Sequence, residues 1–171
     1  MQKQLTHHET KLHKPKIKLV VNACLVHSPA NLGSVFRIAE AFGVSYIQLL
    51  NQQEQTLSSN RFKRVSRNTE SFINVQYVET IEECFLKEQK NEFVKIGIEI
   101  TSNSKPINEF VPKQPVQFVL GNENTGIPTE ILHHLNAVHH IPMYGVNSSL
   151  NVAQSLGICL YQTRNNESAN L

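Results

Sequence analysis

Three short polar stretches carry the side chains best suited to bind or orient a reacting molecule. Residues 27–34 contain a histidine, two serines and an asparagine and lead to Arg37, residues 121–126 read Gly-Asn-Glu-Asn-Thr-Gly, and residues 144–149 read Tyr-Gly-Val-Asn-Ser-Ser. Amides, hydroxyls, a carboxylate and a guanidinium can hold a substrate in a reactive geometry and stabilise developing charge. Taken singly, each stretch is also explained as a turn or helix cap, because those structures favour the same residue types.

The same stretches lack the signatures of several common sites. The sequence contains no G-x-x-x-x-G-K-[ST], no G-x-G-x-x-G and no G-x-S-x-G. It therefore does not predict a phosphate-binding P-loop, an ordinary Rossmann site or a hydrolase nucleophile elbow. The three cysteines are far apart with no C-x-x-C spacing, and adjacent histidines point to different faces of a strand or helix. We therefore expect neither a disulfide framework nor a bound metal.

An alternation of strands and helices must position these stretches. Apolar runs predict buried strands, and apolar residues at helical spacing predict the helices between them. Such strands pair in parallel with helices on both faces of the sheet, and ligands bind at the carboxyl ends of the strands. We therefore expect an α/β fold with the three stretches at one rim. The predicted strands are 19–26, 46–50, 73–78, 93–100, 116–120 and 137–141, and the predicted helices are 32–42, 61–67, 79–89, 127–135 and 150–161.

Length and composition predict a single globular domain. The chain has 171 residues, of which 40% are hydrophobic and 18% charged, with a net charge of +2. We expect the domain to span residues 19–164, with a basic N-terminal tail over 1–18 and a C-terminal tail over 165–171. No apolar run approaches the roughly 18 residues of a membrane helix, and the N-terminus lacks the apolar core of a signal peptide. We therefore expect a cytoplasmic protein without membrane contact.

In chain order, the three stretches resemble the motifs of the SpoU/TrmH-type RNA ribose 2′-O-methyltransferases of the SPOUT superfamily. Residues 31–37 resemble its Asn-x-Gly motif with a following Arg, residues 118–127 its Leu-Gly-x-Glu-x-x-Gly motif, and residues 141–145 with 149–152 its third motif. The resemblance covers nearly the whole chain after Lys18. It implies a parallel sheet whose C-terminal segment forms a deep trefoil knot, although topology rules alone argue against knots. It also implies bound S-adenosylmethionine and a homodimer whose active site uses both subunits.

The resemblance assigns roles to individual residues. It implies that the cofactor contacts Ile98, Gly121, Ile141 and Leu150, and that the catalytic set is Asn31, Arg37, Glu123, Ser149 and Asn151. An arginine keeps its proton at ordinary pH, so we favour a guanidinium that holds an RNA phosphate and stabilises the developing alkoxide over a general base. In this interpretation the other catalytic residues order the loops and the ribose. Gly121 fits this role, because a Cβ at that position would obstruct the close approach of backbone.

The densest basic stretch suggests where RNA binds. Arg61, Lys63, Arg64 and Arg67 surround Phe62, and such a cluster could hold an RNA backbone while the aromatic ring stacks on a base. A solvated helix face explains the same charges equally well. Because the chain lacks the separate RNA-binding domain of many ribosomal-RNA enzymes, we expect tRNA as the substrate in preference to rRNA. The alternatives are a non-catalytic dimeric RNA-binding module of the same fold and a flavodoxin-like nucleotide-binding domain.

Overall fold

The core of the fold is a parallel sheet. A computed structural model describes residues 3–6, 9–10, 13–86, 93–147 and 149–169. Within these ranges seven strands lie in the order β3-β2-β1-β6-β4-β7-β5, and all neighbouring pairs are parallel. The strands are β1 (Leu19–Asn22), β2 (Tyr46–Leu50), β3 (Asn74–Val78), β4 (Val94–Ile98), β5 (Lys105–Pro106), β6 (Val116–Leu120) and β7 (Ala137–His140). The predicted parallel α/β sheet is confirmed.

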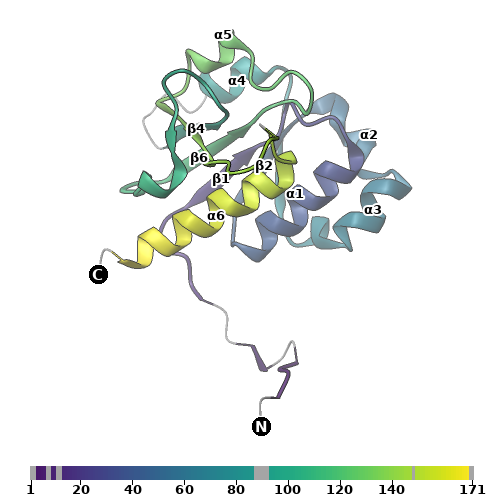
Figure 1. The fold of residues 1–171 in the computed structure, drawn as a ribbon. Coiled ribbons are helices and arrows are strands. Elements are labelled where there is room, and N and C mark those ends of the chain that lie inside the picture. The colour runs from purple at the N-terminus through teal and green to yellow at the C-terminus, as the bar shows by residue number, and fades with distance from the viewer. Residues whose placement is uncertain (1–2, 7–8, 11–12, 87–92, 148, 170–171) are drawn as a thin grey trace.

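Helices cover both faces of this sheet (Figure 1). They are α1 (Pro29–Ala41), α2 (Glu54–Leu57), α3 (Asn60–Ser66), α4 (Ile81–Leu86), α5 (Thr129–Leu132) and α6 (Val152–Ala169), with short 3₁₀ helices at Asn51–Gln53, Thr69–Ser71 and Ile107–Glu109. Val21 and Phe118 belong to the main core beneath α1 and α6, whereas Val119 packs with Phe85 of α4 and Ile131 of α5. Because both faces are covered, β1 and β6 are buried along their whole length.

Several element boundaries differ from the prediction. β1 ends at Asn22 rather than at 26, because the Asn22 side chain accepts the N–H of Cys24 and the chain turns there. The helix predicted over 127–135 is shortened to α5, which follows Pro128. α6 begins two residues later than predicted and runs on to Ala169, so residues 165–169 are helical instead of forming a tail. Of the predicted 79–89, α4 covers 81–86, and residues 87–89 lie outside the described ranges.

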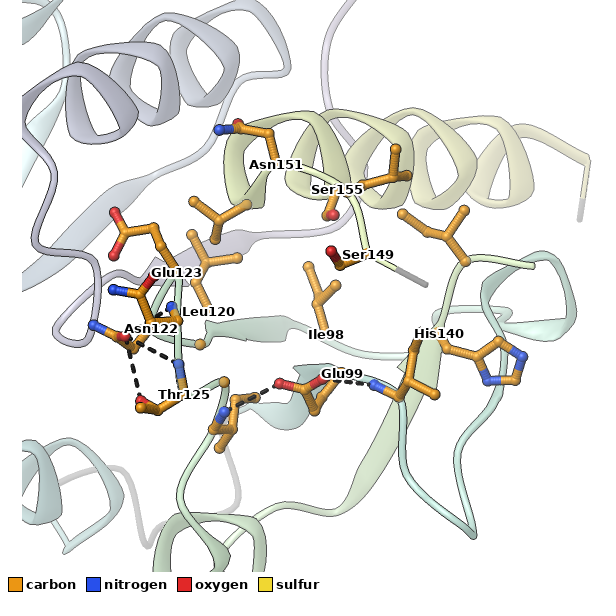
Figure 2. A pocket seen from close by; sticks show the side chains of 18 of the residues that line it. Ile98, Glu99, Leu120, Asn122, Glu123, Thr125, His140, Ser149, Asn151 and Ser155 are labelled. Carbon is orange, nitrogen blue, oxygen red and sulfur yellow. Dashed lines mark hydrogen bonds between the residues drawn. The ribbon is translucent and has the colours of Figure 1, made fainter. Parts of the chain in front are cut away.

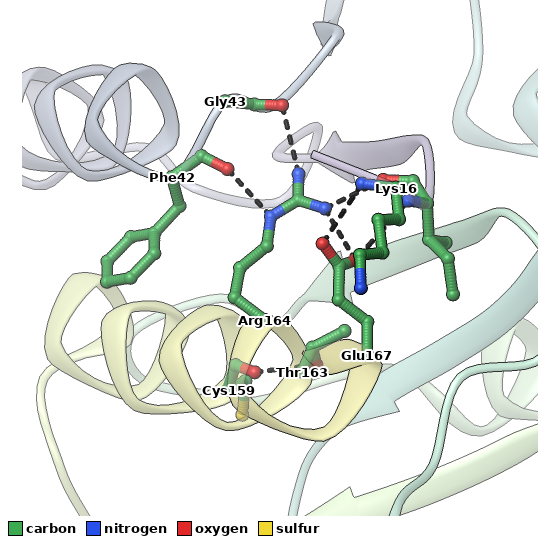
Figure 3. A network of polar contacts seen from close by, with 8 residues as sticks. Lys16, Phe42, Gly43, Cys159, Thr163, Arg164 and Glu167 are labelled. Atoms are coloured by element: carbon green, nitrogen blue, oxygen red, sulfur yellow. Dashed lines mark hydrogen bonds and ion pairs between the residues drawn. The ribbon is translucent and has the colours of Figure 1, made fainter. Parts of the chain in front are cut away.

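A polar network at the end of α6 explains this extension (Figure 3). The Arg164 guanidinium donates to the carbonyl oxygens of Phe42, Gly43 and Ile17 at 2.9, 3.0 and 2.7 Å. It also pairs with Glu167 at 2.9 Å, and the Glu167 carboxylate accepts the backbone N–H groups of Lys16 and Ile17. These contacts join α6 to the end of α1 and to the segment before β1, so residues 16 and 17 are attached to the domain.

Candidate active site

The three polar stretches converge on one cavity of about 760 Å³ at the carboxyl ends of β4, β6 and β7 (Figure 2). All of the predicted cofactor-binding residues line this cavity, namely Ile98, Gly121, Ile141 and Leu150. Of the predicted catalytic residues, Asn31, Glu123, Ser149 and Asn151 line it. Arg37 does not appear in the lining that the described residues form. Eight of the nine residues that the resemblance implied therefore line this cavity, while their individual roles stay predictions.

Asn31 connects the three motif segments 31–37, 118–127 and 149–152 to one another. It lies in the first turn of α1, which begins at Pro29 after the capping residue Ser28. Its side-chain amide donates to Oε1 of Glu123 at 2.9 Å, and its Oδ1 accepts from the Asn151 amide at 2.9 Å. Asn151 in turn caps α6, because its Oδ1 accepts the N–H groups of Ala153 and Gln154 at 3.0 and 3.4 Å. One residue of each motif segment (31–37, 118–127 and 149–152) therefore takes part in a single chain of hydrogen bonds.

The Glu123 carboxylate is held by hydrogen-bond donors of the first stretch. Besides the Asn31 amide, the backbone N–H groups of Ser28 and His27 donate to it at 3.0 and 3.3 Å. Partial burial raises the pKa of Glu123, but hydrogen bonds from Asn31 and from backbone N–H groups outweigh burial and hold the pKa below its usual value. Glu123 is therefore an ionised acceptor that fixes the loop before α1.

The glycines of the second stretch serve its own turn. Asn122 and Gly126 exchange backbone hydrogen bonds at 2.9 and 3.0 Å, and the Asn122 side chain accepts from the N–H groups of Asn124 and Thr125. Gly126 has φ +69°, a conformation that favours glycine. A Cβ on Gly121 would lie 2.7 Å from the carbonyl carbon of Gly126. Gly121 thus allows the close backbone approach that the sequence analysis expected, here between two parts of the protein's own chain, and its contact with the cofactor stays a prediction.

Glu99 is a cavity residue that the sequence analysis missed. It directly follows β4, and its carboxylate accepts the N–H of Ile100 at 2.8 Å and that of Ile127 at 3.1 Å. Figure 2 shows both hydrogen bonds on one side of the cavity. The side chain is half-buried. The available signal was a lone acidic residue at the carboxyl end of an apolar strand, where ligands of parallel sheets bind.

Arg37 lies on the surface of α1 and is not among the described residues that line the cavity. Its side chain is exposed, one turn beyond Gly33. A Cβ on Gly33 would lie 2.9 Å from both the Phe62 carbonyl oxygen and the Val65 Cβ, so this glycine allows α3 to pack closely on α1. A single copy of the chain therefore does not bring Arg37 together with the other predicted catalytic residues.

The basic residues of the α3 segment are exposed, as an RNA-binding role requires. They are Arg61, Lys63, Arg64 and Arg67. The prediction that Phe62 stacks on a base is wrong, because Phe62 is fully buried and packs edge-on against Phe36 with ring centroids 5.1 Å apart. Arg67 ends α3 in the left-handed conformation, with φ 50°.

The cavity lining carries negative charge. It contains the carboxylates of Glu99 and Glu123 and, among the described residues, no lysine or arginine. His140 also lines it, and its Nδ1 forms a hydrogen bond with the Ser104 hydroxyl at 3.0 Å.

Within the described ranges, no group of three or more His, Cys, Asp or Glu side chains could hold a metal ion. In the same ranges, no helix has the length and apolar character to cross a membrane.

Comparisons with known proteins agree on one family. The model of the SpoU rRNA Methylase family matches residues 18–161. The chain is 30% identical over 154 residues to the tRNA (guanosine(18)-2′-O)-methyltransferase TARBP1 of Mus musculus, and 28% identical over 156 residues to the 23S rRNA (guanosine(2553)-2′-O)-methyltransferase RlmP of Bacillus subtilis. These alignments cover 89% and 91% of this chain but only 10% and 61% of the two relatives.

A solved structure of an rRNA methyltransferase is similar to this chain. The AdoMet-bound rRNA methyltransferase from Sinorhizobium meliloti superposes with a TM-score of 0.79 at 25% identity, over 89% of this chain and 57% of that protein. The match of the family model extends from just before β1 into α6 and includes every stretch that lines the cavity. The chain therefore belongs to the SpoU rRNA methylase family.

Proposed function

We propose that this protein binds S-adenosylmethionine in the cavity and transfers its methyl group to a ribose 2′-hydroxyl of RNA, with tRNA preferred to rRNA. The observation that carries the proposal is the convergence of the three motif stretches on one cavity, joined through Asn31. The named activities of the mouse and Bacillus relatives support the reaction type. The tRNA preference follows the mouse relative, whereas the Bacillus relative is named for rRNA. We further propose that the C-terminal segment forms a trefoil knot, as membership of the SpoU rRNA methylase family implies.

The residues of the cavity fit this cofactor. A volume of about 760 Å³ lies in the range of small-molecule sites, and Ile98, Ile141 and Leu150 provide apolar walls. Glu99 and Glu123 face the cavity without a lysine or arginine among the described lining residues. A lining with this charge favours a cationic sulfonium ligand and disfavours the phosphates of ATP or FMN. The charge therefore argues against the flavodoxin-like alternative.

The protein's contribution to the reaction is positioning and charge stabilisation. When bound, the cofactor would supply an electrophilic methyl group to the ribose oxygen, with S-adenosylhomocysteine as the leaving group and the hydroxyl proton released to solvent. Asn31 and Asn151 hold the loops around the reacting atoms, and Ser149 lies at the exposed side of the cavity. An arginine beside the ribose favours the developing alkoxide and binds the adjacent phosphate.

A homodimer supplies that arginine in our proposal. Arg37 is exposed on α1, outside the lining formed by its own chain. The neighbouring helix α6 exposes Ile158 and Tyr161, whose side chains are 41% and 62% accessible. Two copies that bury these apolar side chains along α1 and α6 would each bring Arg37 towards the cavity of the other. The exposed basic residues of the α3 segment then bind the RNA backbone.

Methyl transfer from radiolabelled S-adenosylmethionine tests the proposal. Wild-type protein should label RNA, tRNA more than rRNA, and Arg37→Ala should lower the rate by about 100-fold or more if it stabilises the alkoxide. Lys113→Ala is the matched control, because Lys113 is also exposed and does not line the cavity. RNA that binds without becoming labelled would favour the non-catalytic module. Incorporation that persists in Arg37→Ala would refute the role of Arg37.

A further inference from the structure

We propose that Glu99 accepts hydrogen bonds from the vicinal ribose hydroxyls of the bound nucleoside cofactor and thereby fixes the orientation of its adenosine half. The inference rests on the proposed cofactor. It adds a binding residue outside the three motif stretches, on the strand end between Ile98 and Ile100.

The Glu99 carboxylate is firmly positioned. Its backbone N–H donates to the carbonyl oxygen of His139 at 3.1 Å, which continues the pairing of β4 with β7. Its side chain reaches across to the second stretch, where the Ile127 N–H donates to Oε2. A Cβ on Gly126 would collide with the same oxygen, so the turn leaves just enough room for it. The Ile127 N–H and the turn at Gly126 therefore fix where the carboxylate points, while β7 fixes the backbone of Glu99.

The carboxylate also keeps acceptor capacity for a ligand. One backbone N–H donates to each oxygen, whereas a carboxylate offers about four acceptor positions in all. No lysine or arginine among the described lining residues competes for the remaining positions. The second carboxylate, Glu123, already accepts from the Asn31 amide and two backbone N–H groups. Glu99 is thus the lining carboxylate with more room for donors of the ligand.

The surroundings of Glu99 suit the nucleoside half of the cofactor. Ile98, Ile100 and Ile127 lie next to it in the lining and present apolar surface that suits a planar base. Two adjacent hydroxyls match the two oxygens of a carboxylate. The amino-acid end of the cofactor carries its own carboxylate beside the ammonium, and two carboxylates at close range repel each other. These features favour the ribose hydroxyls over the ammonium group as the partner of Glu99.

Calorimetric titration with three ligands tests the assignment. The ligands are S-adenosylhomocysteine, its 2′-deoxy analogue, and methylthioadenosine, which keeps the ribose and lacks the amino-acid end. Wild-type protein should bind the deoxy analogue about tenfold or more weakly than S-adenosylhomocysteine, as expected for loss of a hydrogen bond to a charged group. Glu99→Gln should weaken S-adenosylhomocysteine and methylthioadenosine to a similar degree and should reduce the discrimination against the deoxy analogue.

Two controls separate binding from structure. Glu130→Gln, at an exposed glutamate of α5 outside the cavity lining, should change no affinity. Equal weakening of all three ligands by Glu99→Gln would indicate a purely structural role and overturn the inference, as would weakening of S-adenosylhomocysteine alone, which would place Glu99 at the amino-acid end. Failure of the wild-type protein to bind S-adenosylhomocysteine would refute the proposed function and this inference with it.

Discussion

Replacing Asn31 should uncouple the three motif segments 31–37, 118–127 and 149–152, which line the cavity. The side chain makes one hydrogen bond to the Glu123 carboxylate and one to the Asn151 amide, both at 2.9 Å. A hydrogen bond to a charged group contributes about 1.5–3 kcal/mol and a neutral one about 1 kcal/mol, and solvent access places both near the low end. Glu123 keeps its two backbone donors. Asn31→Ala should therefore lower the free energy of unfolding by about 2 kcal/mol.

Urea unfolding with a double-mutant cycle measures this coupling. Asn151→Ala removes the same amide contact and also the cap of α6, so it should be destabilising by itself. The double variant should be more stable than the sum of the single effects predicts, by about 1 kcal/mol, because the shared hydrogen bond is lost only once. Additive effects, or a loss below about 0.5 kcal/mol in Asn31→Ala, would refute the view that this bridge holds the stretches together.

Asn31→Asp should make the stability difference from wild type depend on pH. The variant keeps an acceptor for Asn151 but places a second carboxylate at hydrogen-bond distance from Glu123. Two close carboxylates cannot both ionise without repulsion, so the shared proton is bound more tightly than in an isolated carboxyl. Relative to wild type, the variant should be least stable near neutral pH and should recover as the pH falls. A stability difference that does not change with pH would contradict the proposed contact.

Three further predictions concern single positions. Gly33→Ala should lower the free energy of unfolding in urea by about 1–2 kcal/mol, because the added Cβ would meet the backbone of α3. Gly157→Ala in α6, where the atoms nearest to an added Cβ are 3.7 Å away, should raise it by about 0.5–1 kcal/mol. A gain in stability at both sites would contradict the close packing of α1 and α3. Phe62→Ala should cost about 3–5 kcal/mol in the same measurement, and a loss near zero would contradict its burial. Because the folded pKa of Glu123 lies below its ordinary value of 4.5, its stabilising contribution is complete above that pH and is lost as the pH falls through the folded pKa. Unfolding midpoints between pH 6 and 3 should therefore fall less steeply in Glu123→Gln than in wild type.

The elements predicted best are those that local sequence determines. The apolar runs of β2 and β6 have the predicted boundaries, because strands covered on both faces must be apolar at nearly every position. The end of α6 was predicted poorly, since its last turns are polar and resemble a tail. Arg164 and Glu167 hold them through contacts with residues 16, 17, 42 and 43, which no local pattern contains.

The α3 segment shows that local sequence also fails to predict the burial of a single side chain. Basic residues on both sides of Phe62 suggested an exposed aromatic, but a short helix has one face against its neighbour, and the charge pattern does not identify that face. The absence of a side chain at Gly33 on α1 lets α3 approach and bury Phe62 against Phe36.

By itself, the sequence indicated eight of the side chains that line the cavity, because the amides, glycines and carboxylate of the three motifs are recognisable from residue type and order. It did not indicate Glu99, and it grouped Arg37 with residues that line the cavity when Arg37 does not. The tertiary structure decided how they are connected. Asn31 meets Glu123 and Asn151 across 92 and 120 positions of the chain, and Glu99 meets Ile127 across 28. Such contacts depend on the order and register of the strands, which bring distant loops to one edge of the sheet. Residue type fixes what a side chain can bind, but only the packing of the sheet fixes what lies within its reach.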